Sequence, residues 1–264
     1  MLALVAGTGA LPGALLARIA PPLLVCAMAG QPPDLPPDLP RLTFRLEQLG
    51  TFLADLRARG VTRLCMAGAM RRPELNLALV DAATQPLLAR MATAMGQGDD
   101  GTLRTLIALV EQAGITVIAA HALAPDLLPA PGVSTRVAPA SAHRADAALG
   151  EATVAEMGRA DIGQACVIRA GCVITREGAD GTDAMLAALP PDGGILFKAP
   201  KPGQDRRADL PVIGPGTANA AIRAGLDGIV IEAGGVMALD LPQVVELLDQ
   251  AGRFLWVRPQ RTAP

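Results

Sequence analysis

The feature that most constrains the fold is a repeated alternation of short apolar runs with amphipathic helical patterns along the first half of the chain. Residues 2–6, 23–27 and 63–67 are apolar runs with the length of buried strands. Helical spacing of apolar side chains separates them over residues 12–20 and 49–60. Strands that alternate with helices of this length predict a parallel sheet, because parallel neighbours need a long crossover connection.

The second half repeats the mixture of strands and helices after a change in composition. Residues 125–139 are rich in proline and have no lasting hydrophobic period, which indicates an interdomain linker. Beyond it, apolar runs predict strands at residues 166–169, 172–175, 194–198, 228–232 and 254–257. We therefore predict an α/β fold, with an N-terminal Rossmann-like parallel-sheet domain over residues 1–124 and a second, catalytic α/β domain over residues 140–264.

Composition excludes several classes of partner. The net charge is −2 and aromatic residues make up 2% of the chain. Nucleic-acid binding needs a basic surface or aromatic stacking, so no nucleic-acid partner is expected.

The mean hydropathy is +0.36, but charged residues, proline and glycine interrupt every apolar stretch before the roughly 18 residues that a membrane span needs. The amino-terminal stretch lacks the basic start of a signal peptide and carries Arg18. These observations predict a cytoplasmic protein.

The available residue types limit a metal site to oxygen ligands. The four cysteines form no CxxC pair, so neither a zinc site nor a disulfide framework is expected. The two histidines, His121 and His143, have no sequence position that marks a catalyst. A metal held by carboxylates is Mg²⁺ in preference to Zn²⁺.

A glycine-rich turn follows the first predicted strand and begins a helix, with the sequence Gly7, Thr8, Gly9, Ala10, Leu11, Pro12. Backbone amides at such a turn suit an anion. Pro12 replaces the last glycine of the dinucleotide fingerprint, and no acidic residue ends the second strand, so NAD binding is poorly supported. Two interpretations stay open: a phosphate-binding turn, or a tight turn that needs small residues.

Carboxylates gather where three helices are predicted to begin. Asp240, followed by Gln243, is the expected N-cap of the last helix. Asp99 and Asp100 precede another helix, and an N-cap role would explain one of these two carboxylates. Two adjacent carboxylates repel each other, and a nearby metal ion or cationic group would relieve that repulsion. The third group, Asp180, Gly181, Thr182 and Asp183, lies at a strand-to-helix junction. Thr182 is a candidate N-cap of the helix, and the negative charge of Asp183 in the first turn suits the helix dipole. Asp180 has neither role.

The most informative segment runs from residue 198 to residue 211, directly after an apolar strand. Asp205 and Asp209 are candidate Mg²⁺ ligands. Glu232, which ends a later strand, is a further candidate ligand or base. Four basic side chains of the segment can neutralise phosphate oxygens: Lys198, Lys201, Arg206 and Arg207. Ligands of open α/β sheets bind at the carboxyl ends of strands, which favours a phosphate site over a merely solvated charged loop.

Five blocks spread along the chain resemble those of the UDP-2,3-diacylglucosamine pyrophosphatases of the LpxI family, which act in lipid A biosynthesis. They are the turn at residues 7–12, GDDGTLRTLI from Gly98, DGTDAML from Asp180, FKAPKPGQDRRADLPVIGPGT from Phe197 and GIVIEAGG from Gly228. The long Lys/Asp/Arg block is the most specific of them. Asp180 departs from the pattern, because relatives usually carry the longer Glu at this position.

The resemblance implies a homodimer of two-domain subunits that hold a nucleotide-sugar lipid substrate between the domains. It also implies Mg²⁺-assisted attack of water on the α-phosphorus, with release of UMP and 2,3-diacylglucosamine 1-phosphate (lipid X). The essential aspartate falls in the QDRRAD motif and is Asp205 or Asp209. Gln204 and Thr217 of the same block, together with the turn, the helix-start residues and the basic residues above, are the expected substrate-binding residues. A lipid substrate requires no more than peripheral contact with the inner membrane leaflet.

Two other functions are compatible with the same residues. A nucleotide-binding phosphotransferase would use the same phosphate site but pass the phosphoryl group to an acceptor other than water. A non-enzymatic regulator would bind lipid or nucleotide without turnover.

Overall fold

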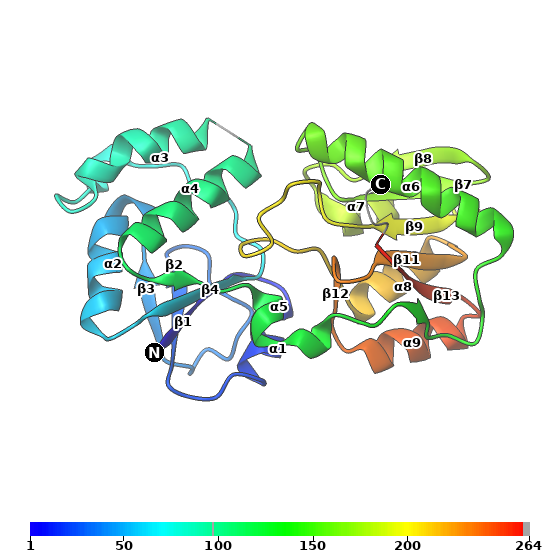
Figure 1. Ribbon diagram of the computed structural model, residues 1–264, viewed down its shortest axis with the longest axis horizontal. Coiled ribbons are helices and arrows are strands. Elements are labelled where there is room, and N and C mark those ends of the chain that lie inside the picture. The colour runs from blue at the N-terminus through cyan, green and yellow to red at the C-terminus, as the bar shows by residue number, and fades with distance from the viewer. Residues whose placement is uncertain (97, 261–264) are drawn as a thin grey trace. The chain divides into compact units, whose positions relative to one another are not determined.

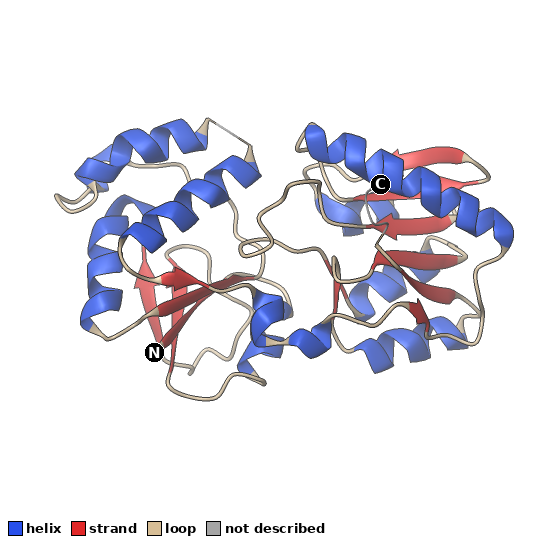
Figure 2. Cartoon of the chain, in the orientation of Figure 1, coloured by secondary structure: helices blue, strands red, loops and turns tan. Residues whose placement is uncertain are grey.

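The computed structural model describes residues 1–96 and 98–260 (Figures 1 and 2). The chain forms two compact units. Unit 1 contains Met1–Pro125 and also the short segment Asp205–Asp209, and unit 2 contains Asp126–Gln204 and the chain from Leu210 onward. Five residues of the charged segment therefore pack with the amino-terminal half, although they lie far along the sequence.

Unit 1 is built on a five-stranded, fully parallel sheet. Its strands in spatial order are β3 (Arg41–Phe44), β2 (Leu23–Met28), β1 (Leu2–Ala6), β4 (Arg63–Ala67) and β5 (Thr116–Val117). The order reverses between β1 and β4, as it does in the Rossmann-like fold. The predicted fold class is confirmed.

Helices and turns connect these strands, and α2, α3 and α4 share one apolar core with the sheet. The connecting elements are α1 (Leu11–Leu16), η1 (Leu46–Gln48), α2 (Leu49–Ala58), η2 (Leu77–Leu79), η3 (Gln85–Leu87), α3 (Leu88–Met95), α4 (Asp99–Gln112) and α5 (Ala120–Leu123). Phe52 and Leu56 of α2 and Ile107 of α4 pack with Ala3 and Val5 of β1. Alternate residues of a strand point to opposite faces, so Leu4, which is also fully buried, supports the other face.

Unit 2 is built on a six-stranded mixed sheet. The spatial order is β6 (Gly132–Val133), β13 (Phe254–Arg258), β11 (Gly228–Glu232), β9 (Ile195–Lys198), β7 (Ala165–Arg169) and β8 (Cys172–Arg176). The central strands β13, β11 and β9 are parallel. β6 pairs antiparallel with β13, β7 pairs antiparallel with β9, and β8 pairs antiparallel with β7. A separate parallel pair joins β10 (Val212–Ile213) to β12 (Met237–Ala238). The segment expected as a linker thus supplies the edge strand β6.

Four longer helices complete unit 2. They are α6 (Ser141–Arg159), α7 (Gly181–Ala187), α8 (Pro215–Arg223) and α9 (Leu241–Gln250), and the short η4 (Pro125–Leu127) precedes them. Ala147 and Val154 of α6 bury Phe197 and Phe254 on one face of the sheet, along which α6 lies in Figure 2. Side chains of α7, α8 and α9 bury the alternate strand residues, including Leu196, in a second core.

Most predicted elements are present, and the differences have local causes. Asp240 caps α9 as expected, with its side chain accepting a hydrogen bond from the Gln243 amide. The first helix is shorter than predicted and ends at Leu16. Four short strands and two helices were not predicted, because two to four residues carry no usable period and α8 is rich in alanine; they are β3, β6, β10, β12, α5 and α8. Within the described part of the chain, no helix has both the length and the apolar character needed to cross a membrane.

The packing of α6 on the sheet gives a first prediction. A Cβ built on Gly150 would lie 2.6 Å from Cγ of Phe197, which is 1% exposed. We expect Gly150→Ala to destabilise the protein by about 1–3 kcal/mol through overpacking, despite the better helix propensity of alanine. Urea unfolding measures the change.

The matched control is Gly216→Ala in α8, where an added Cβ meets nothing within 4 Å. This substitution should be neutral or stabilising by up to about 1 kcal/mol. Equal effects of the two substitutions would contradict the close packing of α6 on β9.

Candidate functional site

The turn after β1 packs against the turn after β4. The Gly7 amide donates to the Ala67 carbonyl oxygen at 2.8 Å, and Thr8 and Ala69 exchange two backbone hydrogen bonds of 2.9 Å. A Cβ on Gly7 would lie 2.3 Å from the Ala69 carbonyl oxygen, and one on Gly68 would lie 2.6 Å from that of Thr8. Glycine is therefore needed here so that two backbones can approach, which favours the tight-turn interpretation of the motif.

The remaining residues of this turn are also engaged within unit 1. The Gly9 amide donates to Oδ2 of Asp34 at 2.6 Å, so a carboxylate of the protein itself lies where an anion was expected. Gly9 has a φ of +92°, a conformation that favours glycine. Leu11 and Pro12 form the first turn of α1 with buried side chains. The structure thus gives all five predicted turn residues a structural role.

Arg207 holds the carboxylate of Asp205 in a fixed orientation. Oδ1 of Asp205 accepts hydrogen bonds from the backbone N and from Nε of Arg207, both at 3.0 Å, and Oδ2 accepts one from Nη2 at 2.7 Å. The same guanidinium forms an ion pair with Glu111 of α4 at 2.7 Å. The hydrogen bonds from Arg207 hold the pKa of Asp205 below its ordinary value, so the carboxylate is ionised at neutral pH.

The first turn of α4 contributes a second carboxylate beside Asp205. Oδ1 of Asp100 accepts a hydrogen bond from the Asp205 amide at 3.3 Å, and Oδ2 pairs with Arg104 at 2.7 Å. The N-cap of α4 is Gly98, so Asp99 and Asp100 are the first helical residues and neither caps the helix from outside. The predicted capping role is wrong, although the helix dipole still favours carboxylates here. The side chain of Asp99 lies outside the described residues.

The other residues of the segment also pack in unit 1. Ala208 packs against the core that α2 and α4 share. Burial, and secondly the charge of Arg206, lower the pKa of His121 on α5, which keeps this imidazole neutral. Asp209 is partly buried, and its amide donates to the Asp205 carbonyl oxygen at 3.3 Å. Asp205 and Asp209 therefore begin and end one compact turn.

In unit 2, Lys198 ends β9 within a buried polar chain. Its Nζ donates to Oγ1 of Thr182 at 2.9 Å, and the Thr182 hydroxyl donates to Oε1 of Glu177. Oε2 of Glu177 accepts the Gln164 amide at 2.7 Å. Lys198, Thr182 and Glu177 are only 7%, 8% and 7% exposed. Thr182 lies inside α7, so its expected capping role is wrong, and its hydroxyl links the other two side chains.

Lys201 and Gln204 shape the loop that follows β9. Nζ of Lys201 pairs with Oδ1 of Asp161 at 2.5 Å, just beyond the end of α6. Oε1 of Gln204 accepts a hydrogen bond from the Lys201 amide at 3.0 Å and closes the turn. Both predicted substrate-binding residues thus have a structural contact within unit 2.

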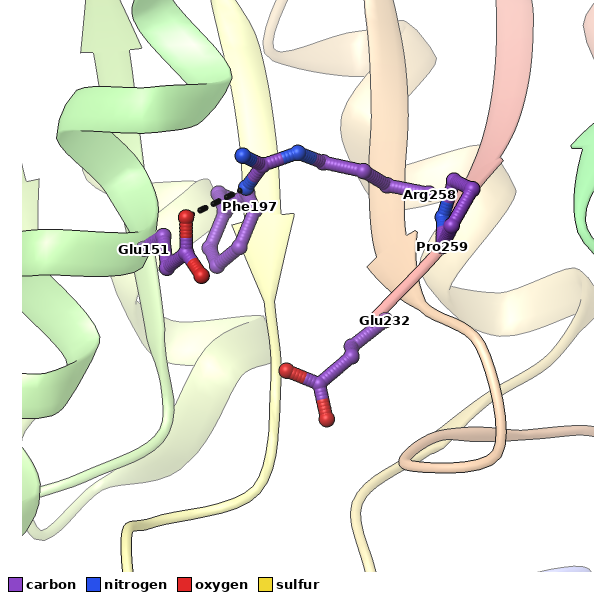
Figure 3. Close-up of a pocket in the computed structure, with 5 residues that line it drawn as sticks. All are labelled: Glu151, Phe197, Glu232, Arg258 and Pro259. Carbon is purple, nitrogen blue, oxygen red and sulfur yellow. Dashed lines mark ion pairs between the residues drawn. The ribbon is translucent and has the colours of Figure 1, made fainter. Parts of the chain in front are cut away.

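Glu232 lines a small depression at the carboxyl ends of the parallel strands. Arg258 is its register partner on β13 and forms an ion pair with Glu151 of α6 at 2.9 Å. Figure 3 shows this pair beside the ring of Phe197, with the Glu232 carboxylate pointing away from it; Pro259 completes the lining. The carboxyl edge of the sheet therefore carries both signs of charge, as expected for a ligand-binding edge.

The other predicted residues of unit 2 lie around helix starts. Asp180 occupies the N-cap position of α7 without a side-chain capping bond, and both Asp180 and Asp183 are exposed. Gly181 has a φ of +82°, which its lack of a side chain allows. Oγ1 of Thr217 accepts a weak hydrogen bond of 3.4 Å from the Gly214 amide at the start of α8.

The donor chemistry suits Mg²⁺ only in part. Within the described residues, no group of three or more His, Cys, Asp or Glu side chains is arranged to hold a metal ion. Asp205 and Asp100 are paired with Arg207 and Arg104. Mg²⁺ in proteins usually keeps several waters and is held by one or two carboxylates together with substrate phosphates. Asp205 and Asp100 could therefore hold such an ion only together with water and oxygens from a ligand, because they form no closed cage of their own.

The fold and the site define a two-unit α/β protein that carries ion pairs in one charged loop and at the carboxyl edge of one sheet. Residues 1–127 match the LpxI N-terminal domain, and residues 130–256 match the LpxI C-terminal domain. A protein of Caulobacter vibrioides named UDP-2,3-diacylglucosamine pyrophosphatase LpxI is 37% identical over 225 residues, which cover 81% of this chain and 80% of that protein. The chain belongs to the LpxI family, as the five sequence blocks indicated.

Several residues that complete these contacts were missed by the sequence reasoning. Glu177, Asp161, Asp34 and Glu111 each bind a predicted residue. Arg258 is the register partner of the predicted Glu232 and binds Glu151. Apart from Glu177, each is a single charged residue in a segment without a motif, so only tertiary contacts identify it. Glu177 alone carried a signal, because it is an acid directly after an apolar strand and before a glycine.

The three hydrogen bonds from Arg207 to Asp205 should make a pH-dependent contribution to the stability of the protein. A carboxyl whose pKa is lowered by folding stabilises the native state above the ordinary Asp pKa of about 3.9, and this stabilisation is lost as the pH falls below that value. We expect Arg207→Gln to raise the pKa of Asp205 toward the ordinary range and to reduce the loss of stability between neutral and acid pH. NMR titration of the Asp205 carboxyl carbon measures the first effect, and urea unfolding the second.

Arg59→Gln is the control, because Arg59 forms an exposed i, i+4 pair with Asp55 at 3.4 Å. It should leave the titration of Asp205 unchanged. An Asp205 pKa that stays low in Arg207→Gln would contradict the assignment of Arg207 as its main cause.

Proposed function

We propose that this chain hydrolyses the diphosphate of UDP-2,3-diacylglucosamine to UMP and 2,3-diacylglucosamine 1-phosphate. Membership of the LpxI family and the activity for which the Caulobacter relative is named support the reaction. The observation that carries the proposal is that the Asp205 carboxylate of the QDRRAD segment is held in one orientation. Asp205 is ionised, only 18% exposed and fixed by three hydrogen bonds from Arg207. A flexible solvated loop would not hold a carboxylate in this way.

The proposed roles follow from the contacts of each side chain. Asp205 or Asp209 orients the attacking water or accepts its proton. Lys198 and Arg206 bind phosphate oxygens, and Arg207 supports Asp205 while contributing positive charge to the same segment. Lys201, which is bound to Asp161, holds the loop in shape. A preorganised arrangement of this kind saves the cost of orienting charged groups during the reaction.

Mg²⁺ is the proposed cofactor, with Asp205, Asp209 and Glu232 as candidate ligands. When bound with the substrate, it would polarise the phosphoryl oxygen and neutralise charge on the leaving group. The hard carboxylate oxygens of these side chains suit this ion, and substrate phosphates would complete its coordination.

The cellular setting is proposed on the chemistry of the substrate. Two acyl chains favour peripheral contact of a cytoplasmic enzyme with the inner membrane leaflet. We also propose a homodimer, as the resemblance to the family suggested.

The proposal predicts metal-dependent hydrolysis that depends on the QDRRAD carboxylates. Purified protein should release UMP from UDP-2,3-diacylglucosamine with Mg²⁺, and EDTA should abolish the release. Asp205→Ala or Asp209→Ala should lower kcat by roughly 100-fold or more, the range expected for loss of a general base or of a metal ligand. Asp55→Ala, which removes an exposed carboxylate of α2, is the control and should be fully active.

Isotope labelling distinguishes hydrolysis from the alternatives. In H₂¹⁸O, attack of water on the α-phosphorus places ¹⁸O in UMP. Transfer of the nucleotide to an added acceptor without ¹⁸O-labelled UMP would identify a phosphotransferase. Tight binding of the substrate without any product would identify a binding protein, and turnover unaffected by both EDTA and the aspartate substitutions would exclude the metal-assisted mechanism.

A further inference from the structure

We infer that Glu177 and Thr182 are positioning residues for Lys198, which they hold at the carboxyl end of β9 as a ligand for the oxygens of a diphosphate. This inference rests on the proposed function for the identity of the anion. It assigns a role to Glu177, which no sequence motif marks. It also changes the role of Thr182 from direct substrate binding to support of the lysine.

The sheet register explains why three residues are needed. Ala165 on β7 is the register partner of Lys198 on β9, and the Glu177 amide donates to the Ala165 carbonyl oxygen at 2.9 Å. Glu177 is therefore two strand spacings from Lys198, or about 10 Å between backbones. The Thr182 hydroxyl, carried on the first turn of α7, bridges the two side chains.

The hydrogen-bond chain has one direction. A threonine hydroxyl has one proton to donate and two lone pairs. The Thr182 proton goes to Oε1 of Glu177, so its lone pairs face Nζ of Lys198. Oε2 of Glu177 is fixed by the Gln164 amide, which prevents the carboxylate from turning toward solvent. The negative charge is thereby transmitted to the ammonium through a polarised hydroxyl.

Such a buried charged chain needs a reason beyond stability. Burial of an ammonium and a carboxylate carries a desolvation cost that mutual attraction barely offsets, and apolar residues would stabilise the fold at least as well. The position at the carboxyl end of a parallel strand is where α/β sheets bind ligands.

The choice of lysine supports the same conclusion. Only two of the 23 basic side chains are lysines, Lys198 and Lys201, and all others are arginines. Both lie in the loop that begins at β9. Lysine is a compact point charge on a flexible stem, which a short hydroxyl can hold, whereas the planar guanidinium requires a wider set of acceptors.

Kinetics of the full-length protein test the inference. With UDP-2,3-diacylglucosamine in detergent micelles and Mg²⁺, Glu177→Gln and Thr182→Val should each lower kcat/KM about tenfold or more, the loss expected when one charge-assisted hydrogen bond is broken. Thr182→Ser, which keeps the hydroxyl, should restore most of the activity. Asp161→Asn, which breaks the other lysine pair, is the matched control and should have a much smaller effect.

NMR provides a readout that does not need turnover. Protein labelled with ¹³C-lysine gives two ε-methylene signals, which Lys198→Arg assigns. Inorganic pyrophosphate should shift the Lys198 signal in the wild type and in Asp161→Asn, and it should shift this signal much less in Glu177→Gln and Thr182→Val. Circular dichroism checks folding, and the Thr182→Ser and Thr182→Val pair decides the test if Glu177→Gln does not fold.

The outcomes separate this inference from the proposed function. Full activity and an unchanged pyrophosphate response in Thr182→Val would overturn the positioning role and leave hydrolysis standing. Absence of hydrolysis in the wild type, with a pyrophosphate response that still depends on Glu177 and Thr182, would overturn the proposed substrate and support the positioning role. A wild-type Lys198 signal that ignores pyrophosphate would overturn the inference.

Discussion

Parallel strand pairing is the constraint on which the rest of this structure depends. It brings the carboxyl ends of neighbouring strands to one edge of each sheet, and the chain treats the two edges differently. In unit 1, the turns after β1 and β4 pair with each other through Thr8 and Ala69 and close the edge with backbone. In unit 2, the strand ends carry Lys198, which is the register partner of Ile231, and the register partners Glu232 and Arg258. The chemistry of the two sheets therefore differs although their core architecture is related.

Opposite charges fix the side chains that the proposed reaction needs. Arg207 donates hydrogen bonds to Asp205 and forms an ion pair with Glu111. The Thr182 hydroxyl accepts a hydrogen bond from Lys198 and donates one to Glu177, so it links these two charged side chains. The Arg207–Asp205 pairing is partly exposed, with 42% and 18% of the two side chains accessible, so solvent screens it in part. The chain from Glu177 through Thr182 to Lys198 is buried. In both pairings, hydrogen bonds fix the side chain that the proposed reaction uses.

The charged segment also shows how a short loop can belong to a distant part of the chain. Asp205–Asp209 lies between strands of unit 2 in sequence, yet it packs in unit 1 through Ala208 and the Asp205 amide. The sequence block that begins at Phe197 is therefore divided between the two units, with Asp205–Asp209 in unit 1 and the residues before and after it in unit 2. The segment supplies the carboxylates of the proposed reaction, and Lys198 at its amino-terminal side belongs to unit 2.

The sequence by itself determined the α/β class, the strands and helices with a clear hydrophobic period, and the charged segment. It did so because periodicity and charge are local properties of neighbouring residues. The tertiary structure decided which charges meet. The sequence left two interpretations of Gly7 and Gly9 open, an anion-binding turn and a tight turn, and the structure shows the close approach of Gly7 to Ala69 and the hydrogen bond from Gly9 to Asp34. The link between Glu177 and Lys198 is visible only in the structure, where Thr182 hydrogen-bonds to both side chains. Such pairings depend on sheet register and crossover geometry, which link residues far apart in sequence, and no local pattern encodes them.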